Sequence, residues 1–138
     1  MNSIEKIQKD IVEEFNLFDD WQDKYEHLIE LGKEMETLPE KHKNQSNIID
    51  GCQSNVWIVA EFKNKKIKFL ADSDAIITKG IISLLLRVFS EQSPLDILNA
   101  NYNFIELIGL KKHLSINRAS GLESMINKIK EYALIFNK

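Results

Sequence analysis

The sequence predicts an α+β fold in which a small antiparallel sheet is packed against several helices. Two observations lead to this prediction. Apolar residues recur every three or four positions in both halves of the chain, which is the period of a helix. Between these segments, residues 56–71 contain two apolar runs, rich in β-branched and aromatic residues, that are separated by a short polar turn. Helices before and after one hairpin are typical of an α+β domain.

Length and charge restrict the class of protein further. The 138 residues suit one domain, which we expect to span residues 1–138. The net charge of −3 disfavours nucleic acid as the main partner. No apolar run reaches the roughly 18 residues of a membrane span, and the amino terminus has no apolar signal core. A single cysteine allows no internal disulfide, so a reducing cytoplasmic setting is expected.

Two helices are expected before the hairpin. Ser3 is a suitable N-cap for a first helix that extends to Phe15, because the apolar residues step by three or four. Asp19 followed by Gln22 has the polarity of a capping box and predicts the start of a second helix. That helix is expected to end near Pro39, since proline lacks the N–H that a helix interior needs.

The middle of the chain is expected to hold a loop and the hairpin. Residues 40–47 are polar and predict a solvated loop. Residues 56–62 and 66–71 are the predicted strands, with Trp57 in the core beneath the preceding loop. The hairpin lysines are expected to form a solvated edge that blocks pairing with other strands. These lysines are Lys63, Lys65, Lys66 and Lys68.

The rest of the chain is expected to be helical. A long helix should follow the acidic run at 72–74, and because it is apolar around much of its circumference it should be buried on more than one side. Ser93 followed by Pro94 predicts the N-cap and first position of another helix. The last helix is expected to begin within 117–120.

Cys52 is the principal candidate for chemistry. It lies between Gly51 and a polar run, directly before an apolar strand, and is therefore expected in a loop, where functional groups concentrate. Gly51 allows a positive φ and a sharp bend before the thiol. A thiol reacts as the thiolate, which requires nearby positive charge or hydrogen-bond donors. The candidate donors are Arg118, Lys79, the backbone N–H groups of residues 53–54 and the histidines.

The composition excludes several kinds of site. One cysteine is too few for a Cys-rich zinc site or for an iron–sulfur cluster held by this chain alone. His27, His42 and His113 are far apart and show no ligand spacing, so no metal is expected. No glycine-rich phosphate-binding motif occurs, and no nucleotide cofactor is expected.

Two other functions stay open on the residues alone. Free cysteine often behaves as a small buried hydrophobe, in which case the chain is a non-catalytic interaction domain with an inert thiol. Alternatively, Cys52 is the nucleophile of a hydrolase, which requires a histidine within hydrogen-bond reach. Nothing in the sequence places a histidine beside Cys52.

Residues 47–59 resemble the cysteine segment of the SufE family, with Gly-Cys-Gln-Ser-x-Val-Trp at 51–57. SufE proteins are sulfur acceptors that work with type II cysteine desulfurases in iron–sulfur cluster assembly. Four further blocks resemble the family in the same order and extend the resemblance over about residues 20–130. They are 21–25 with 29–32, 72–75 with 79–80, 93–97, and 114–118 with 121–122.

The resemblance implies a fold shared with IscU-type scaffold proteins and a role in sulfur transfer. Cys52 would receive a persulfide sulfur from a SufS-like cysteine desulfurase and pass it on to an iron–sulfur scaffold. The chain would activate the desulfurase without being an independent enzyme. It would hold no cofactor, because pyridoxal phosphate belongs to the partner. The paralogous CsdE-like activators have similar motifs and remain an alternative, and a homodimer is a further expectation because the family includes dimers.

The resemblance also assigns supporting roles around Cys52. In the family the cysteine loop shelters its sulfur in a pocket and swings out toward the partner, and here Gly51, Gln53 and Ser54 would shape that loop. Arg118 would pair with a partner carboxylate or stabilise the sulfur anion; the alternative is a salt bridge at the start of the last helix. Asp74 would accept a hydrogen bond from the cysteine loop; the alternative is an N-cap of the long helix.

Overall fold

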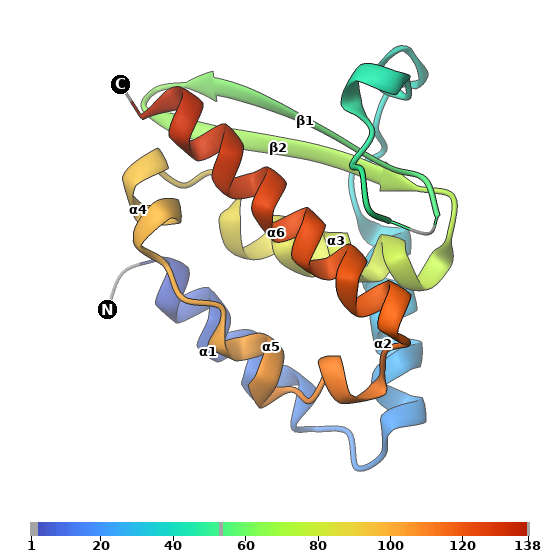
Figure 1. Cartoon of the computed structure of the whole chain (residues 1–138). Helices are drawn as coiled ribbons and strands as arrows, with labels where there is room; N and C mark the ends of the chain where they lie inside the picture. The colour runs from blue at the N-terminus through green and yellow to red at the C-terminus, as the bar shows by residue number, and fades with distance from the viewer. Residues whose placement is uncertain (1–2, 53, 138) are drawn as a thin grey trace.

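The computed structural model describes residues 3–52 and 54–137 and has the predicted α+β architecture. Figure 1 shows one β-hairpin, with α6 running diagonally across the front of the molecule and α3 behind it. The elements are α1 (Ser3–Phe15), α2 (Trp21–Glu34), η1 (Glu40–His42), η2 (Gln45–Asn47), β1 (Val56–Lys63), β2 (Lys66–Ser73), α3 (Ile76–Phe89), α4 (Pro94–Asn99), α5 (Asn103–Leu107), η3 (Lys111–His113) and α6 (Ile116–Phe136).

The sheet is an antiparallel pair of strands joined by a tight turn. Its register runs from Val56 opposite Ser73 to Lys63 opposite Lys66. Asn64 and Lys65 between them both have positive φ, 54° and 65°, which matches the twist of a two-residue hairpin turn. Figure 1 shows the hairpin above α3 and α6, and the strand residues that face these helices are buried. They are Val56, Ile58, Ile67, Phe69 and Ala71.

Trp57 does not lie in the core, contrary to the prediction. Side chains alternate along a strand, so Trp57 points to the opposite face from the fully buried Val56 and Ile58. It is half-buried there, with the Lys43 ammonium 5.9 Å from its ring centroid. The aromatic residue of this strand therefore packs against the segment before the hairpin.

Two helix starts differ from the prediction by a short distance. Asp20, not Asp19, caps α2, because its Oδ1 accepts a hydrogen bond of 2.9 Å from the Asp23 N–H. The last helix begins at Ile116, one residue before the predicted range, since Ser115 accepts from the Arg118 N–H. Ser93 caps α4 as predicted, with Pro94 at the first helical position.

The segment between α2 and the hairpin is more ordered than the predicted solvated loop. Helix α2 ends at Glu34, before Pro39, and two short 3₁₀ turns follow. Lys43 is largely buried and forms ion pairs of 2.9 Å with both Glu40 and Asp72. This cluster attaches the segment to the end of β2. The segment itself lies directly before the cysteine loop in the sequence.

Helix α3 is the central helix and is buried on more than one side, as predicted. It approaches α2 so closely that a Cβ on Gly80 would lie 2.4 Å from the Leu28 carbonyl oxygen, and one on Gly32 would lie 2.8 Å from the Gly80 nitrogen. The two glycines thus permit a backbone contact between the helices. Within the described ranges 3–52 and 54–137, no helix is both long and apolar enough to cross a membrane.

Candidate functional site

Cys52 lies in a short loop that is attached to the sheet at both ends. Before it, the Ile49 N–H donates a 2.8 Å hydrogen bond to the Val56 carbonyl. After it, the Asn55 carbonyl accepts hydrogen bonds from Ser73 Oγ at 2.8 Å and from the Asp74 N–H at 3.3 Å. Gly51 has φ of +92°, as its predicted role in a sharp bend requires. Gln53, the fourth loop residue named from the sequence, lies outside the described residues.

The Cys52 side chain is half-buried and faces helix α6. Its Sγ lies 3.7 Å from the Gly121 carbonyl oxygen, to which the thiol donates a weak hydrogen bond. Gly121 faces the sulfur, and a Cβ added at that position would lie 3.4 Å from Sγ, which is an ordinary van der Waals distance. Burial raises the pKa of the Cys52 thiol, so the neutral form is favoured in this conformation.

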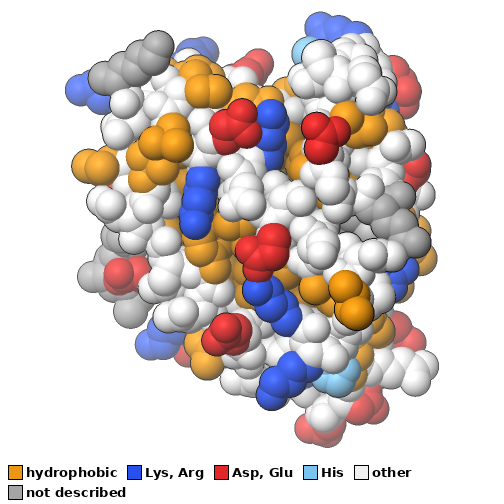
Figure 2. Space-filling view, viewed as in Figure 1, with side chains coloured by type: hydrophobic (Ala, Val, Ile, Leu, Met, Phe, Trp, Pro, Cys, Tyr) orange, Lys and Arg blue, Asp and Glu red, His pale blue; other side chains and the backbone are white. Residues whose placement is uncertain are grey.

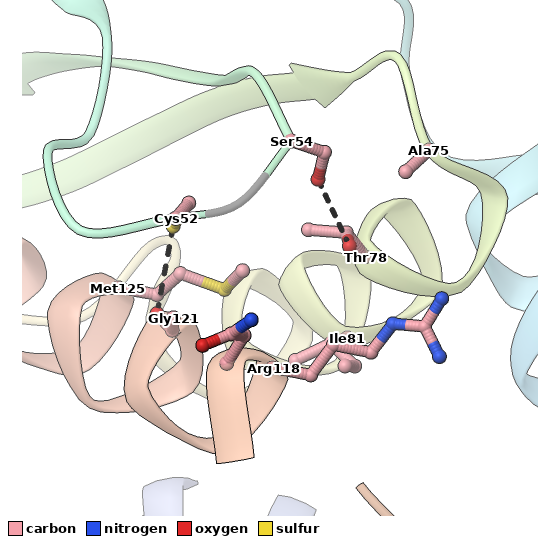
Figure 3. Close-up of a pocket in the computed structure, with 9 residues that line it drawn as sticks. Cys52, Ser54, Ala75, Thr78, Ile81, Arg118, Gly121 and Met125 are labelled. Atoms are coloured by element: carbon pink, nitrogen blue, oxygen red, sulfur yellow. Dashed lines mark hydrogen bonds between the residues drawn. The ribbon is translucent and has the colours of Figure 1, made fainter. Parts of the chain in front are cut away.

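A cavity of about 230 Å³ opens beside the sulfur, between the first turns of α3 and α6. Figure 3 shows it in close-up, with the Cys52 loop on one side and α6 on the other. Ser54 donates a 3.2 Å hydrogen bond to Thr78 across one wall. The cavity is lined by Cys52, Ser54, Ala75, Thr78, Ile81, Asn117, Arg118, Gly121 and Met125.

Asp74 accepts hydrogen bonds from the cysteine loop and does not cap α3. Its Oδ1 lies 3.1 Å from the Asn55 nitrogen and its Oδ2 lies 2.9 Å from Asn55 Nδ2. The N-cap position of α3 is occupied by Ala75, which has no side-chain acceptor. The capping alternative is therefore wrong for Asp74, and the carboxylate instead fixes the carboxyl-terminal end of the loop.

Arg118 lines the cavity but does not contact the thiol. Its backbone N–H donates to Ser115, and its side chain is exposed. Figure 3 shows the guanidinium group extending toward the start of α3, away from Cys52. Among the described residues Arg118 forms no ion pair, so the predicted alternative of a salt bridge at the start of the last helix is wrong.

Lys79, another candidate from the sequence, is held away from the thiol by Asp72. Its Nζ lies 3.2 Å from Asp72 Oδ1. Burial acts to raise the pKa of Asp72, but hydrogen bonds from Lys43, the Ser73 N–H and Lys79 outweigh this effect, and the pKa is lowered overall. Lys79 thus neutralises a buried carboxylate in this conformation.

The histidines also lie elsewhere. His27 Nε2 is 2.7 Å from Glu14, and the His113 ring stacks on Trp21 at 4.1 Å between centroids. In the part of the chain that the structure describes, no histidine lines the cavity, and no group of three or more potential metal ligands occurs. A general base for a Cys–His hydrolase is therefore not at hand beside Cys52.

Several cavity residues were not identified from the sequence. Asn117, Gly121 and Met125 are spaced by four, so they share one face of α6, and Thr78 comes from α3. Their spacing within the last helix was a usable signal, since Arg118 lies in the first turn of the same helix. The pairing of that face with α3 depends on tertiary packing and is not visible in the sequence.

The fold and the site define a small α+β protein with one sheltered cysteine in a loop beside a cavity. Residues 9–133 match the family model described as "SufE: Fe-S metabolism associated domain". The chain belongs to the SufE family, which associates it with iron–sulfur metabolism.

Two relatives cover nearly the whole chain. An uncharacterized SufE-like protein of Rhizobium meliloti (strain 1021) is 36% identical over 128 residues, which is 89% of this chain and 91% of that protein. An uncharacterized SufE-like protein of Rhizobium etli is 35% identical over 130 residues, which is 91% of this chain and 88% of that protein.

A solved structure has a similar fold. It is the solution structure of a hypothetical protein from Thermus thermophilus, with a TM-score of 0.77 and 18% sequence identity. The similarity covers 94% of this chain and 95% of that one, so the whole arrangement of helices around the hairpin is shared.

Proposed function

We propose that this chain is a sulfur acceptor and activator of a SufS-like cysteine desulfurase, and that residues 1–138 act as one SufE-like domain. Cys52 receives a persulfide sulfur and passes it on toward an iron–sulfur scaffold. One observation carries the proposal: the only cysteine of a SufE-family chain lies in a loop with its sulfur beside a cavity of about 230 Å³. A carrier needs such a place because an exposed persulfide is readily oxidised or reduced.

The transfer is a thiol–disulfide type of exchange at sulfur. The Cys52 thiolate attacks the outer sulfur of a cysteine persulfide on the desulfurase. A new S–S bond forms to Cys52, the S–S bond of the donor breaks, and the donor cysteine leaves as a thiolate. The electrons and the transferred sulfur balance without an added oxidant or reductant. Pyridoxal phosphate, which releases sulfur from free cysteine, is held by the partner.

The surrounding residues have separate tasks in this scheme. Gly51 and Ser54 shape the loop, and Asp74 fixes its far end through Asn55. Arg118 supplies the positive charge nearest the cavity, which favours an anionic sulfur or a partner carboxylate at its mouth. Because the guanidinium points away from the sheltered thiol, this contribution requires movement of the loop or of Arg118.

The direct test replaces Cys52 with Ser and measures sulfide release from free cysteine by the purified desulfurase. The unmodified chain should stimulate the enzyme, and Cys52→Ser should leave only its basal rate. Intact mass after incubation with the enzyme and cysteine should show one added sulfur atom on the unmodified chain. Stimulation by Cys52→Ser equal to that by the unmodified chain would refute the proposal.

The CsdE-like alternative differs only in the partner. Pull-down of the chain with each type of desulfurase in turn separates the two activators. The interaction-domain alternative with an inert thiol predicts no sulfur on Cys52, and it is less well supported because Cys52 borders a cavity instead of lying fully in the core.

A further inference from the structure

We propose that the hydroxyl pair of Ser54 and Thr78 donates a hydrogen bond to the outer sulfur of the Cys52 persulfide and so holds the transferred sulfur in the cavity. This inference rests on the proposed function and names the groups that recognise the sulfur once it is loaded. It gives a role to Thr78, a cavity residue that the sequence did not indicate.

The two hydroxyls share one hydrogen bond and have one hydrogen left over. Ser54 Oγ donates to Thr78 Oγ1 at 3.2 Å. Each hydroxyl carries a single hydrogen, so one of the two is unused whichever oxygen donates. Neither hydroxyl forms a second hydrogen bond with any residue in the ranges 3–52 and 54–137. The second hydrogen is therefore available to an acceptor in the cavity.

This hydrogen belongs to a buried pair. Thr78 is only 6% exposed and lies in the first turn of α3. Figure 3 shows its hydroxyl facing that of Ser54, which comes from the same loop as Cys52. Buried polar groups in folded proteins nearly always have their hydrogen bonds satisfied. An unused donor at this place therefore indicates an acceptor that the cavity holds in another state of the protein.

The geometry of Cys52 makes its outer sulfur that acceptor. Cys52, Ser54 and Thr78 line the same cavity of about 230 Å³. The empty thiol donates to the Gly121 carbonyl oxygen at 3.7 Å, and a carbonyl accepts hydrogen bonds but cannot donate one to an anion. An added sulfur lies about 2 Å beyond Sγ. Rotation of the Cys52 side chain then turns it from the carbonyl into the cavity, toward the hydroxyls.

A persulfide needs such a donor because it ionises more readily than a thiol, which makes the outer sulfur an anion at neutral pH. Figure 2 shows Lys and Arg mixed with Asp and Glu on the face that α6 crosses, so positive charge is not concentrated there. Arg118 is the one cation among the described lining residues, and it extends away from Cys52. Asn117 also lines the cavity but is exposed to water. The buried donor is the hydroxyl pair.

The experiment loads the persulfide chemically, so it does not depend on a desulfurase. Cys52 attacks a soluble aromatic disulfide, which forms a mixed disulfide and releases one aromatic thiolate. Sulfide then attacks Cys52 Sγ, releases the second aromatic thiolate and leaves the persulfide. Intact mass confirms one added sulfur atom. The near-ultraviolet absorbance of the persulfide anion, followed against pH without oxygen, gives the persulfide pKa.

The variants remove the hydroxyls singly and together: Ser54→Ala, Thr78→Val and the double variant. Thr78→Ser keeps a hydroxyl, and Ser83→Ala is the matched control. Ser83 lies on the same helix, but its hydroxyl donates to the Gly80 carbonyl and does not line the cavity. A hydrogen bond donated to an anion lowers its pKa, so removing the donor raises it. We expect the persulfide pKa of the double variant to rise by about one unit, a tenfold change in the ionisation constant. Thr78→Ser and Ser83→Ala should change that constant less than about twofold.

The single variant with the larger effect identifies the hydroxyl that contacts the sulfur. An unchanged persulfide pKa in the double variant, or an equal rise in Ser83→Ala, would overturn the proposal. Thermal unfolding before loading shows whether each variant is folded, and Thr78→Ala replaces Thr78→Val in the double variant if valine prevents folding. Failure of the proposed function is seen separately, as stimulation of the desulfurase by Cys52→Ser.

Discussion

At the sulfur atom of Cys52 the surroundings favour the neutral thiol. The side chain is half-buried, its hydrogen bond is to a carbonyl oxygen, and the nearby Arg118 and Lys79 are directed elsewhere. Burial raises the thiol pKa above its ordinary value of 9.0. In this conformation the Cys52 thiol is therefore kept in its protonated form at neutral pH, and the proposed sulfur transfer requires a change in its surroundings that favours the thiolate.

The rate of Cys52 alkylation by iodoacetamide should reflect this shelter. The thiolate is the reacting species, so the rate rises with pH and its midpoint reports the pKa. We expect a midpoint above 9.0 for the folded chain and a midpoint near the ordinary value for the chain unfolded in urea. Because the folded pKa is the higher one, the neutral thiol contributes fully to stability below the unfolded pKa, and this contribution decreases as pH rises through the folded pKa. A folded midpoint at or below that of the unfolded chain would contradict the assignment.

The contacts and orientations of single side chains were harder to predict from the sequence than the helices and strands. For Asp74 the sequence allows either a cap or a partner of the loop, and both roles require an acceptor at the same place in the sequence. The outcome depends on Asn55, which the hairpin register places beside Asp74. For Trp57 the usual burial of strand aromatics predicts the core, but the alternation of the strand sends the side chain to the other face.

At the level of elements, the cysteine loop fits closely against α6. Gly51 lies over Ser124, and a Cβ on Gly51 would come within 2.5 Å of Ser124 Oγ. One turn earlier on the same helix, Gly121 faces the sulfur. The absence of a side chain at Gly51 thus allows the loop to lie close to α6.

Gly51→Ala should raise the alkylation rate of Cys52 several-fold, because the new Cβ both strains a positive φ and collides with Ser124. Gly109→Ala is the matched control: Gly109 has φ of +79°, and a Cβ added there would meet no atom within 4 Å outside its immediate chain neighbours. It should lose stability by about 1 kcal/mol without changing the alkylation rate. Gly51→Ala combined with Ser124→Ala should recover part of the shelter. Equal alkylation rates in Gly51→Ala and Gly109→Ala would argue against close packing of the cysteine loop on α6.

The elements themselves were largely predictable. Helical periodicity located α1 and α3, the serine and proline located α4, and the alternation located the hairpin. The boundaries of α2 and the two 3₁₀ turns were missed because they depend on contacts outside their own segments. Lys43, for example, is held by Asp72 from β2, some 30 residues away in the sequence.

For the whole molecule, the contact between α2 and α3 determines how the helices pack around the site. Gly80→Ala should destabilise the protein by about 2 kcal/mol, because overpacking against the Leu28 carbonyl outweighs the gain in helix propensity. Gly121→Ala, in the interior of α6, meets neighbours only at 3.4 Å or more and should be neutral or stabilising by up to about 1 kcal/mol. Urea denaturation measures both. A smaller loss for Gly80→Ala than for Gly121→Ala would show that the close helix contact is absent in solution.

The fold class and the family were visible in the sequence, since five motif blocks occur in order along the chain. The cavity was not. It forms where the first turns of α3 and α6 meet, and these segments are about 40 residues apart in the sequence. Only Cys52, Ser54 and Arg118 among its lining residues were identified beforehand.

The two attachments of the cysteine loop limit how far its sulfur can travel. Ile49 and Asn55 are both bonded to the sheet, and Cys52 is three residues from each of them. Three extended residues span roughly 10 Å. With both anchors kept, any movement of Cys52 is therefore confined to this distance from Ile49 and Asn55, at the end of the hairpin where β1 begins and β2 ends. For the proposed transfer, a donor whose own cysteine lies in a deep recess must therefore have an entrance wide enough to admit this end of the molecule.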